Sequence, residues 1–288
     1  MNFINIETFI AVVKFMNFSR AADSLFISQS TVTSRIKSLE DELKTELFIR
    51  DGKAIRLTAA GERFLNHALK IQNVIKAAAQ DISMYDKYSN SLSICAPDSV
   101  WEYTLSDSVA NFMAQRPDTA MKLKCGHSEF VVSDILLGLA DIGVIFQKVY
   151  DDEIGAVEFF RSRFNLVVKK GLFNDKPPYI TPENIQSYNP IMMEWGGAFN
   201  AWYSKYYKTQ IHRYEIDGVS LFINMLLSGK GIGFLPDRIS NTYIRSGQLE
   251  CLDFKHKDTL PDDLAYIIFL RKNKTKVKDF LSFIHLFH

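Results

Sequence analysis

Apolar positions near the N-terminus recur at the spacing of two short helices joined by a tight turn. In the first helix Ala21, Ala22 and Leu25 face inward, and Ser19 can cap its start. Ser28 can cap the second helix. Its apolar residues follow at steps of four, three and four: Val32, Ile36, Leu39 and Leu43. Each helix therefore presents one apolar stripe to a core.

The opposite face of the second helix carries short hydrogen-bonding groups and two cations: Gln29, Ser30, Thr31, Thr33, Ser34, Arg35 and Lys37. A helix-turn-helix reads DNA with such a surface, its second helix lying in the major groove. We therefore predict a DNA-binding surface that also includes Ser19, Arg20 and Ser28. Spacing alone fits a second interpretation equally well, two amphipathic helices of any small α-helical domain.

The following segment predicts a β-hairpin. Two apolar arms, 47–50 and 54–57, flank an Asp-Gly pair, which is a strong signal for a tight turn. The hairpin would place Arg50, Lys53 and Arg56 on a projecting wing. Cations there suit phosphate contacts, which position a protein on DNA without reading its sequence. The alternative, a solvated charged hairpin, leaves the adjoining helix pair unexplained.

A long helix is predicted from Thr58, which can cap it, to about Tyr88. Its apolar positions alternate steps of four and three over about three heptads: Phe64, Ala68, Ile71, Ile75, Ala78, Ile82 and Tyr85. Because the other faces are polar, this seam favours a dimerising helix over a helix buried in one domain. A dimer would present two recognition helices to a two-fold related DNA site.

Beyond Asn90 the pattern changes to alternating strands and helices, which implies parallel or mixed sheets covered by helices. Strands are predicted at 92–96, 120–125, 141–146, 164–168, 191–193, 212–216, 231–235 and 265–270, and helices at 99–116, 130–139, 198–207, 219–227 and the C-terminus. Two such series predict two α/β lobes: lobe I at about 90–160 and 265–288, and lobe II at about 161–264. Small ligands bind at the carboxyl ends of strands at such junctions.

Four motifs occur in order: Ser-Arg-Ala-Ala-Asp-Ser-Leu at 19–25, Ile-Ser-Gln-Ser-Thr-Val-Thr-Ser-Arg-Ile-Lys-Ser-Leu-Glu at 27–40, Leu-Phe-Ile-Arg at 47–50 and Ile-Arg-Leu-Thr-Ala-Ala-Gly-Glu at 55–62. With them, residues 4 to 65 closely resemble the DNA-binding half of LysR-type transcriptional regulators, and the whole length fits that family's architecture. One departure is Ser34-Arg35, where many members place a long basic or amide side chain first. The base-contacting pattern, and hence the operator, therefore stays open.

The resemblance implies an α/β protein overall with three parts. These are a winged helix-turn-helix at 1–58, a dimerising linker helix at 59–89, and an effector-binding region at 90–288 that resembles periplasmic binding proteins. It implies a cytoplasmic transcription regulator, a homodimer or homotetramer without a cofactor. Its partners would be promoter DNA with an inverted-repeat site, a small-molecule effector and a second copy, and the resemblance also admits RNA polymerase.

By resemblance, three loops line the effector pocket. Their residues are Ser99, Val100, Trp101, Gly126, His127, Ser128, Trp195, Gly196, Gly197, Ala198 and Phe199. Free backbone N–H groups at helix starts receive anions, so glycines beside aromatic rings suit a small organic acid as the effector. The alternative is that Trp101, Trp195 and Phe199 serve as hinge or core packing.

Composition changes this picture little. The chain has 288 residues, 47% of them hydrophobic, and a formal net charge of +1, which fits two or three ordinary globular domains. Residues 1–88 carry 12 Lys and Arg against 10 Asp and Glu, so DNA affinity must come from local placement rather than from the global field. Three well-separated cysteines argue for a reducing cytoplasm. Cys95 and Cys125 lie in predicted strands, where we expect buried structural thiols. The six histidines show no metal-binding spacing.

Two other classes of protein fit parts of this pattern. Residues 91–288 alone would fit a solute-binding protein for transport, which requires a secretory signal that the sequence lacks. An enzyme would have to use Asp98, Glu102 and His127, but they form no recognisable set of nucleophile, base and orienting group. The glycines at 229–233 precede a strand instead of following it, so they predict no dinucleotide site.

Overall fold

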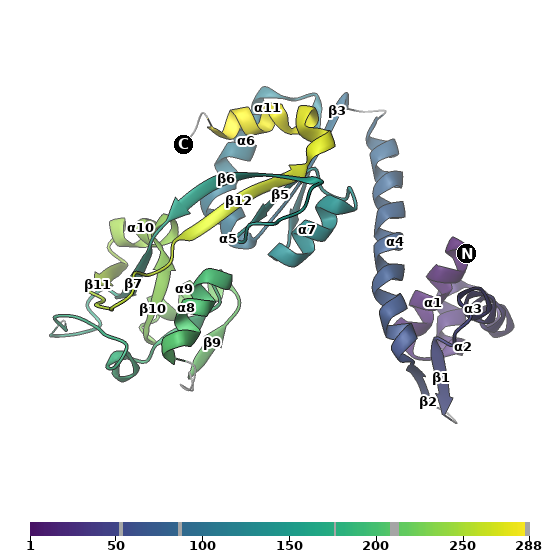
Figure 1. Ribbon diagram of the computed structural model, residues 1–288, viewed down its shortest axis with the longest axis horizontal. Coiled ribbons are helices and arrows are strands. Elements are labelled where there is room, and N and C mark those ends of the chain that lie inside the picture. The colour runs from purple at the N-terminus through teal and green to yellow at the C-terminus, as the bar shows by residue number, and fades with distance from the viewer. Residues whose placement is uncertain (52–53, 86–87, 176, 208–212, 286–288) are drawn as a thin grey trace. The chain divides into compact units, whose positions relative to one another are not determined.

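The computed structural model describes residues 1–51, 54–85, 88–175, 177–207 and 213–285. They form two compact units, Met1–Lys87 and Tyr88–His288 (Figure 1). Each unit has its own apolar core. No helix in these ranges combines the length and the apolar character that a membrane span requires.

The N-terminal unit is a winged helix-turn-helix. Its elements are α1 (Phe3–Phe15), α2 (Phe18–Leu25), α3 (Gln29–Leu43), β1 (Phe48–Asp51), β2 (Ala54–Leu57) and α4 (Ala59–Tyr85). The predicted helix pair is confirmed as α2 and α3. Ala21, Val32 and Ile36 are fully buried, so the two apolar stripes do meet in one core.

One predicted cap is wrong and one is confirmed. The N-cap of α2 is Asn17, whose Oδ1 accepts from the Arg20 N–H at 3.0 Å, whereas Ser19 lies inside the helix. Phe18 is buried at the helix start, which explains why the helix begins before Ser19. Ser28 caps α3 as expected, its Oγ accepting from the Thr31 N–H at 3.2 Å.

The hairpin forms as predicted, with Phe48 opposite Leu57 and Asp51 opposite Ala54. Glu40 at the end of α3 anchors it, because its Oε1 accepts the backbone N–H groups of Leu47 at 2.8 Å and Phe48 at 3.2 Å. The predicted wing residue Lys53 and the side chain of Arg50 lie outside the part that the structure describes.

Helix α4 begins at its predicted cap, since Thr58 Oγ1 accepts the Gly61 N–H at 2.9 Å. Gly61 is required there: a Cβ at this position would lie 2.2 Å from the Leu47 carbonyl oxygen. The first half of the predicted dimer seam packs inside the unit itself, namely Phe64, Ala68 and Ile71. The rings of Phe9 and Phe64 lie 5.0 Å apart, and Ala68 is fully buried.

This packing corrects the prediction that the whole seam faces a second copy. The second half stays free in the chain, with Ile75 41% and Ile82 75% exposed. Ala78 is exposed as well, and the side chain of Tyr85 lies outside the described part.

Lobe I is built on a five-stranded mixed sheet in the order β4-β3-β5-β12-β6. The strands are β3 (Asn90–Ala96), β4 (Thr119–Cys125), β5 (Ile142–Ile145), β6 (Ile154–Ser162) and β12 (Asp263–Leu270). Strand β3 runs parallel to β4 and β5, while β12 is antiparallel to β5 and β6.

Helices cover both faces of this sheet. The helix after β3 comprises α5 (Asp98–Val100), a π-helical segment Trp101–Leu105 and α6 (Ser106–Gln115). It packs on one face together with α11 (Lys274–His285), which follows a 3-10 turn at Arg271–Asn273. Helix α7 (Ser128–Leu136) packs on the other face, through residues that include the fully buried Val131 and Ile135.

Lobe II holds two smaller sheets. Antiparallel β10 (Ile232–Pro236), β7 (Phe164–Lys169) and β11 (Leu249–Leu252) form one, and parallel β8 (Ile191–Met193) and β9 (Tyr214–Ile216) form the other. The helical elements are α8 (Gly197–Tyr207), α9 (Val219–Leu227), α10 (Asp237–Arg245) and a 3-10 turn at Ile185–Tyr188. Strands β6 and β11 and helix α10 were not predicted from the sequence.

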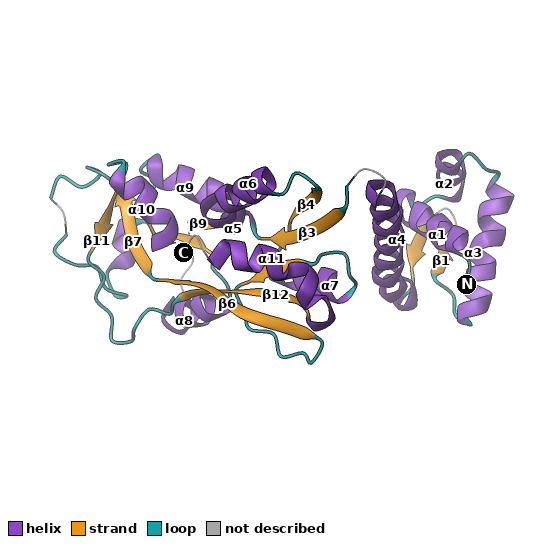
Figure 2. Cartoon of the chain, turned by 90° about the horizontal axis from the view of Figure 1, so that it is seen from above, coloured by secondary structure: helices purple, strands orange, loops and turns teal. Residues whose placement is uncertain are grey.

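Strands β6 and β12 are the connection between the lobes. The chain leaves lobe I through β6 and returns through β12, and Ser162 and Asp263 are paired where the two strands meet lobe II. Figure 2 shows the two strands side by side from above. Lobe II is thus one continuous segment between two paired strands of lobe I.

Candidate functional site

The predicted DNA-binding face of α3 is a polar surface on a firmly packed helix. Ser28, Gln29, Ser30, Ser34 and Lys37 are exposed, and Thr31 and Thr33 are half-buried. On the opposite face Val32, Ile36 and Leu39 are all fully buried. The core therefore fixes the rotation of α3, and with it the direction of its polar face.

Hydroxyl groups link the start of α3 to α2. Ser19 Oγ donates to Gln29 Oε1 at 2.8 Å. Because this bond uses only the amide oxygen, it does not occupy the two amide N–H donors of Gln29. The Ser28 hydroxyl lies 2.8 Å from the hydroxyls of both Ser30 and Thr31. These short side chains are thereby ordered before any ligand arrives.

Besides the exposed Lys37, three described cations of this surface differ in the contacts that they make within the unit. Arg35 is half-buried and its Nη1 donates to Thr8 Oγ1 of α1 at 3.3 Å, so part of its hydrogen-bonding capacity is used within the unit. Arg20 is exposed, with its guanidinium 5.5 Å from the centre of the Phe15 ring. Arg56 on β2 is exposed and suited to phosphate contact.

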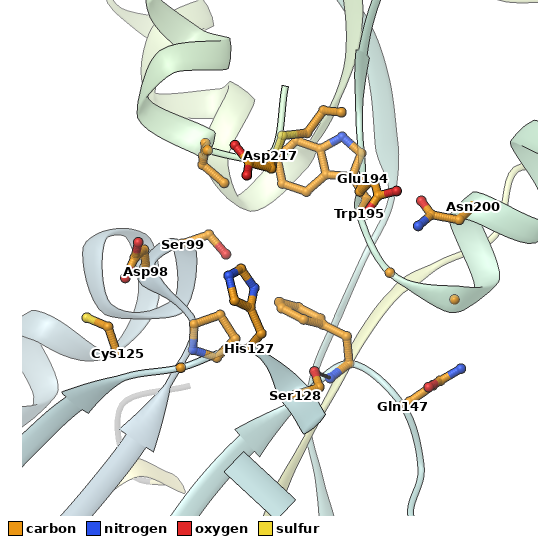
Figure 3. A pocket seen from close by; sticks show the side chains of 18 residues that line it. Asp98, Ser99, Cys125, His127, Ser128, Gln147, Glu194, Trp195, Asn200 and Asp217 are labelled. Atoms are coloured by element: carbon orange, nitrogen blue, oxygen red, sulfur yellow. Dashed lines mark hydrogen bonds between the residues drawn. The ribbon is translucent and has the colours of Figure 1, made fainter. Parts of the chain in front are cut away.

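A pocket of about 520 Å³ lies between the two lobes of the second unit. Its lining comes from the loops and helix starts that follow strands β3, β4, β5, β8 and β9, from the last residues of β4 and β8, and from Asn200 within α8: Pro97, Asp98, Ser99, Cys125, Gly126, His127, Ser128, Phe146, Gln147, Met193, Glu194, Trp195, Gly196, Gly197, Asn200, Asp217, Gly218 and Val219. Figure 3 shows how these side chains converge. A cavity of this size at the carboxyl ends of strands is typical of small-molecule sites.

Seven of the eleven predicted effector-binding residues line this pocket: Ser99, Gly126, His127, Ser128, Trp195, Gly196 and Gly197. Gly196 has a φ of +107°, a conformation that glycine adopts readily and that turns the chain from β8 into α8. Trp195 is 8% exposed, and its Nε1 donates to the Phe234 carbonyl at 2.8 Å. Its ring therefore forms a fixed wall.

Four predicted residues point elsewhere. Val100 is fully buried in the core of lobe I, and the Trp101 Nε1 donates to the Lys124 carbonyl at 2.8 Å. Ala198 is exposed outside the pocket, and Phe199 packs in the lobe II core, its ring centre 4.5 Å from that of Phe164. The prediction is wrong for these four because each helical residue turns about 100° from its predecessor.

Sequence reasoning missed two loops, Phe146–Gln147 after β5 and Asp217–Val219 after β9. Their signal was the same as for the loops that were found, a position directly after a parallel strand. It also missed Asn200, whose Oδ1 is buried without a hydrogen-bond partner in the described part of the chain.

Arg238 at the start of α10 forms hydrogen bonds both to the pocket residue Ser99 and to strand β12, one of the two strands that connect the lobes. Its Nε donates to Asp263 Oδ2 at 2.7 Å and its Nη1 to the Ser99 carbonyl at 3.0 Å. The side chains of Arg238 and Asp263 are only 10% and 1% exposed. Burial raises the pKa of Asp263, and Arg238, together with a hydrogen bond from Ser162, opposes that rise. Arg238 thus joins lobe II to the pocket residue Ser99.

Two further polar contacts cross between the lobes from the π-helical segment. The Tyr103 and Tyr243 hydroxyls lie 2.9 Å apart, and Ser220 Oγ donates to Glu102 Oε2 at 3.4 Å. Burial and the hydrogen bond to Tyr243 raise the pKa of Tyr103, so the phenol stays protonated. π-Helical turns occur frequently at functional sites, and this one carries the residues that face the other lobe.

Cys125, which was predicted to be a buried thiol, is an exposed residue of the pocket wall. A hydrogen bond with Asp98, followed by desolvation, raises its pKa. Cys95 in β3 is buried, as predicted, and this burial raises its pKa to about 11. Among the described residues, His, Cys, Asp and Glu form no group of three or more that could hold a metal ion.

Thiol labelling reports on this pocket. With iodoacetamide near pH 8 we expect alkylation of Cys125 and Cys251, which are exposed, and none of Cys95, because only the thiolate reacts. Asp98→Asn should accelerate labelling of Cys125, since Asp98 is the main cause of its raised pKa. Peptide mass spectrometry separates the three sites. Labelling of Cys95 in the native protein would contradict its burial.

Comparison with known proteins agrees with this architecture. Residues 3–62 match the family model of the bacterial regulatory helix-turn-helix protein, lysR family, and residues 86–286 match the LysR substrate binding domain. The chain is 26% identical over 292 residues to the HTH-type transcriptional regulator CitR of Bacillus subtilis, covering 100% of both. It is 27% identical over 247 residues to the regulator HdfR of Yersinia enterocolitica, covering 83% of this chain and 82% of HdfR.

Solved structures show the same fold. The crystal structure of CbnR, a LysR family transcriptional regulator, superposes with a TM-score of 0.74 at 17% identity over 99% of both chains. Full-length CbnR complexed with its target DNA gives a TM-score of 0.73 at 18% identity, again over 99% of both.

A winged helix-turn-helix followed by a two-lobed ligand-binding fold defines a transcription regulator that carries an effector-binding domain. The chain belongs to the LysR family and is a LysR-type DNA-binding transcriptional regulator. The relatives that it matches are regulators, not enzymes.

Proposed function

We propose that this regulator acts in the cytoplasm as a homodimer or homotetramer that binds inverted-repeat promoter DNA through α3 and the wing. A small molecule in the interlobe pocket changes that binding, and RNA polymerase is a further partner at the promoter. The observation that carries this proposal is the exposed polar face of α3, held in one orientation by a fully buried apolar face. CbnR, a structural neighbour of the same family, is described in complex with its target DNA.

The proposed coupling follows from where the pocket lies. Its walls come from both lobes, so a ligand that touches both favours one arrangement of the lobes over another. That preference is the free energy available for changing DNA binding, and by linkage DNA must change effector affinity by the same factor. The contacts at Arg238 and Tyr103 already cross between the lobes and would be adjusted.

The pocket gives an enzyme little support. Asp98 and His127 line it, but Glu102 does not and instead accepts a hydrogen bond from Ser220. The three groups that sequence reasoning weighed as a catalytic set are therefore not assembled around one point. A reaction would need a nucleophile, a base and an orienting group within hydrogen-bond reach of one another.

Side-chain replacements on the DNA-binding surface should separate sequence reading from phosphate contact. Gln29→Ala should weaken the free energy of operator binding by about 1–3 kcal/mol and relax the base preference at one operator position. Arg56→Ala should weaken binding to all DNA sequences alike and reduce the slope of log affinity against log salt concentration by about 1. The matched control is Lys76→Ala on an exposed face of α4. Fluorescence anisotropy on operator and scrambled DNA measures all three.

Genome-wide mapping of DNA bound by the purified protein, at a defined salt concentration, tests the proposal as a whole. A few sites containing an inverted repeat would support a sequence-specific dimeric regulator, and the neighbouring genes would narrow the choice of effector. Diffuse, strongly salt-dependent binding with and without candidate effectors would contradict it.

A further inference from the structure

The interlobe pocket has an unusual charge for an organic-acid site. Three of its lining residues are acidic, Asp98 from lobe I and Glu194 and Asp217 from lobe II, and none of the described lining residues is lysine or arginine. All three carboxylates are exposed to the solvent-accessible space. Figure 3 shows Asp98 and His127 on one wall and Asp217 and Glu194 across from them. An anion entering this space would meet net negative charge on both sides.

The carboxylates also occupy the places that would attract an anion. Asp98 is the first residue of α5, and Asp217 precedes Gly218, the N-cap of α9. Glu194 lies three residues before the start of α8 at Gly197. Carboxylates near helix N-termini interact favourably with the partial positive charge there. Two of the three helix starts that led the sequence to predict an organic acid, those of α5 and α8, therefore already carry a carboxylate of the chain.

Two of these carboxylates and one amide lack hydrogen-bond partners among the described residues. Glu194 and Asp217 form no hydrogen bond or ion pair with any residue that the structure describes, and Asn200 presents a buried Oδ1 without a donor. A buried acceptor without a donor costs free energy that a ligand N–H recovers. The rings of Phe146 and Trp195 also border the space, and aromatic faces attract ammonium groups.

We infer that the effector is an organic amine with at least two positive charges, of the diamine or polyamine class, which bridges Asp98 of lobe I to Glu194 and Asp217 of lobe II. A metal ion does not fit as well, because the described carboxylates are not grouped closely enough to coordinate one. Two charges separated by a flexible chain match acceptors on two walls and would draw the lobes together. This inference rests on the proposed function, namely that the pocket receives the effector.

Four-carbon probes of different charge test the inference on the full-length protein. Putrescine, succinate and butanediol have matched length, and spermidine adds one amine. We expect calorimetry to detect putrescine and spermidine, but neither succinate nor butanediol, at millimolar concentration. Bound amine should slow alkylation of Cys125, which lines the pocket, and leave Cys251 unchanged. Succinate binding more tightly than putrescine, or no binding of either amine, would overturn the inference.

Three substitutions locate the bound charge: Asp98→Asn, Glu194→Gln and Asp217→Asn. Each replaces a charged acceptor by a neutral amide oxygen and should weaken putrescine binding about tenfold. The matched control is Asp107→Asn on α6, an exposed carboxylate outside the pocket, which should leave the affinity unchanged. Wild-type affinity in all three pocket variants would place the amine elsewhere and refute the assignment.

DNA binding separates failure of this inference from failure of the proposed function. If succinate protects Cys125 and changes occupancy of the mapped operators, the proposed function stands and the charge assignment is wrong. If amines fill the pocket but operator affinity stays constant, the charge assignment stands and the effector role of the pocket is wrong.

Discussion

Arg238→Met is expected to lower the free energy of unfolding of the effector-binding domain by about 3–5 kcal/mol, because it leaves the carboxylate of Asp263 buried without its cation. Asp263 is 1% exposed and lies 2.7 Å from the arginine Nε. Urea denaturation followed by tryptophan fluorescence measures this loss. The three tryptophans, Trp101, Trp195 and Trp202, all belong to the second unit, so the signal reports on that unit alone.

A double variant and pH identify the cause. Adding Asp263→Asn to Arg238→Met removes the unpaired charge and should recover most of the loss, since the amide still accepts from Ser162. Burial raises the pKa of Asp263 in the folded state, and loss of Arg238 raises it further. A raised folded pKa destabilises the ionised protein, so the deficit should shrink as the pH falls toward the ordinary aspartate value of about 3.9. A pH-independent deficit below about 1 kcal/mol would contradict the buried-charge explanation.

Ile82→Asp is expected to abolish the proposed dimer and to reduce affinity for an inverted repeat by a hundredfold or more, roughly the gain that linked binding of two half-sites provides. Ile82 is 75% exposed in the chain, on the half of α4 that does not pack against the winged helix. An aspartate there would bury an unpaired charge in a helix–helix contact. Ile75→Asp, at a position 41% exposed, should act in the same direction.

The control for these variants is Asn73→Asp, which adds the same charge at an exposed position on the opposite face of α4. Light scattering gives the oligomeric state, and anisotropy on full and half-site DNA gives the affinities. A stable dimer with unchanged DNA affinity in Ile82→Asp would refute the role of this seam. Unchanged half-site affinity would show that the winged helix itself is still folded.

The sequence predicted the winged helix well because its determinants are local. The apolar steps in α3 and the Asp-Gly pair of the hairpin each define one element without reference to distant residues. The cap of α2 was less certain, because Asn17 and Ser19 are both good N-cap residues. Burial of Phe18 decided between them, and burial depends on the assembled core.

The heptad seam in α4 shows a different limit. An apolar stripe indicates that the helix packs against a partner. The stripe looks the same whether that partner is another helix of the chain or a second copy of the protein. Here α1 covers the first half, where Phe9 meets Phe64. The positions at Ile75 and Ile82 follow the same periodicity and have no such cover.

The elements that were missed have weak local signals. Strand β6 shows no regular alternation of buried and exposed residues, and its pairing with β12 shifts register at Ala265 and Tyr266. Helix α10 is rich in Ser, Asn and Thr, which favour helices poorly, and begins directly after Pro236. Both become regular through tertiary contacts, at Asp263 for β6 and at Arg238 for α10.

The sequence identified loops that form the pocket, but not which side chains of those loops face it. The rule that ligands bind after parallel strands identified the segments around Ser99, His127 and Trp195. It did not say which residue of each helical start turns inward, so Phe199 was chosen where Asn200 faces the space. Nor did it give the sign of the charge, because Asp217 lies in a loop that the sequence analysis left out.

The pairing of Ser162 with Asp263 means that lobe II could be exchanged as one continuous segment. Because the chain enters and leaves lobe II at two neighbouring residues of one antiparallel pair, a different lobe II that also supplies a cation for Asp263 can replace it at these two positions without disturbing the strand order of lobe I. A two-residue turn is enough to close such a pair altogether. Evolution or design can therefore exchange half of the chemical specificity of the regulator while the DNA-reading part and the other half stay as they are.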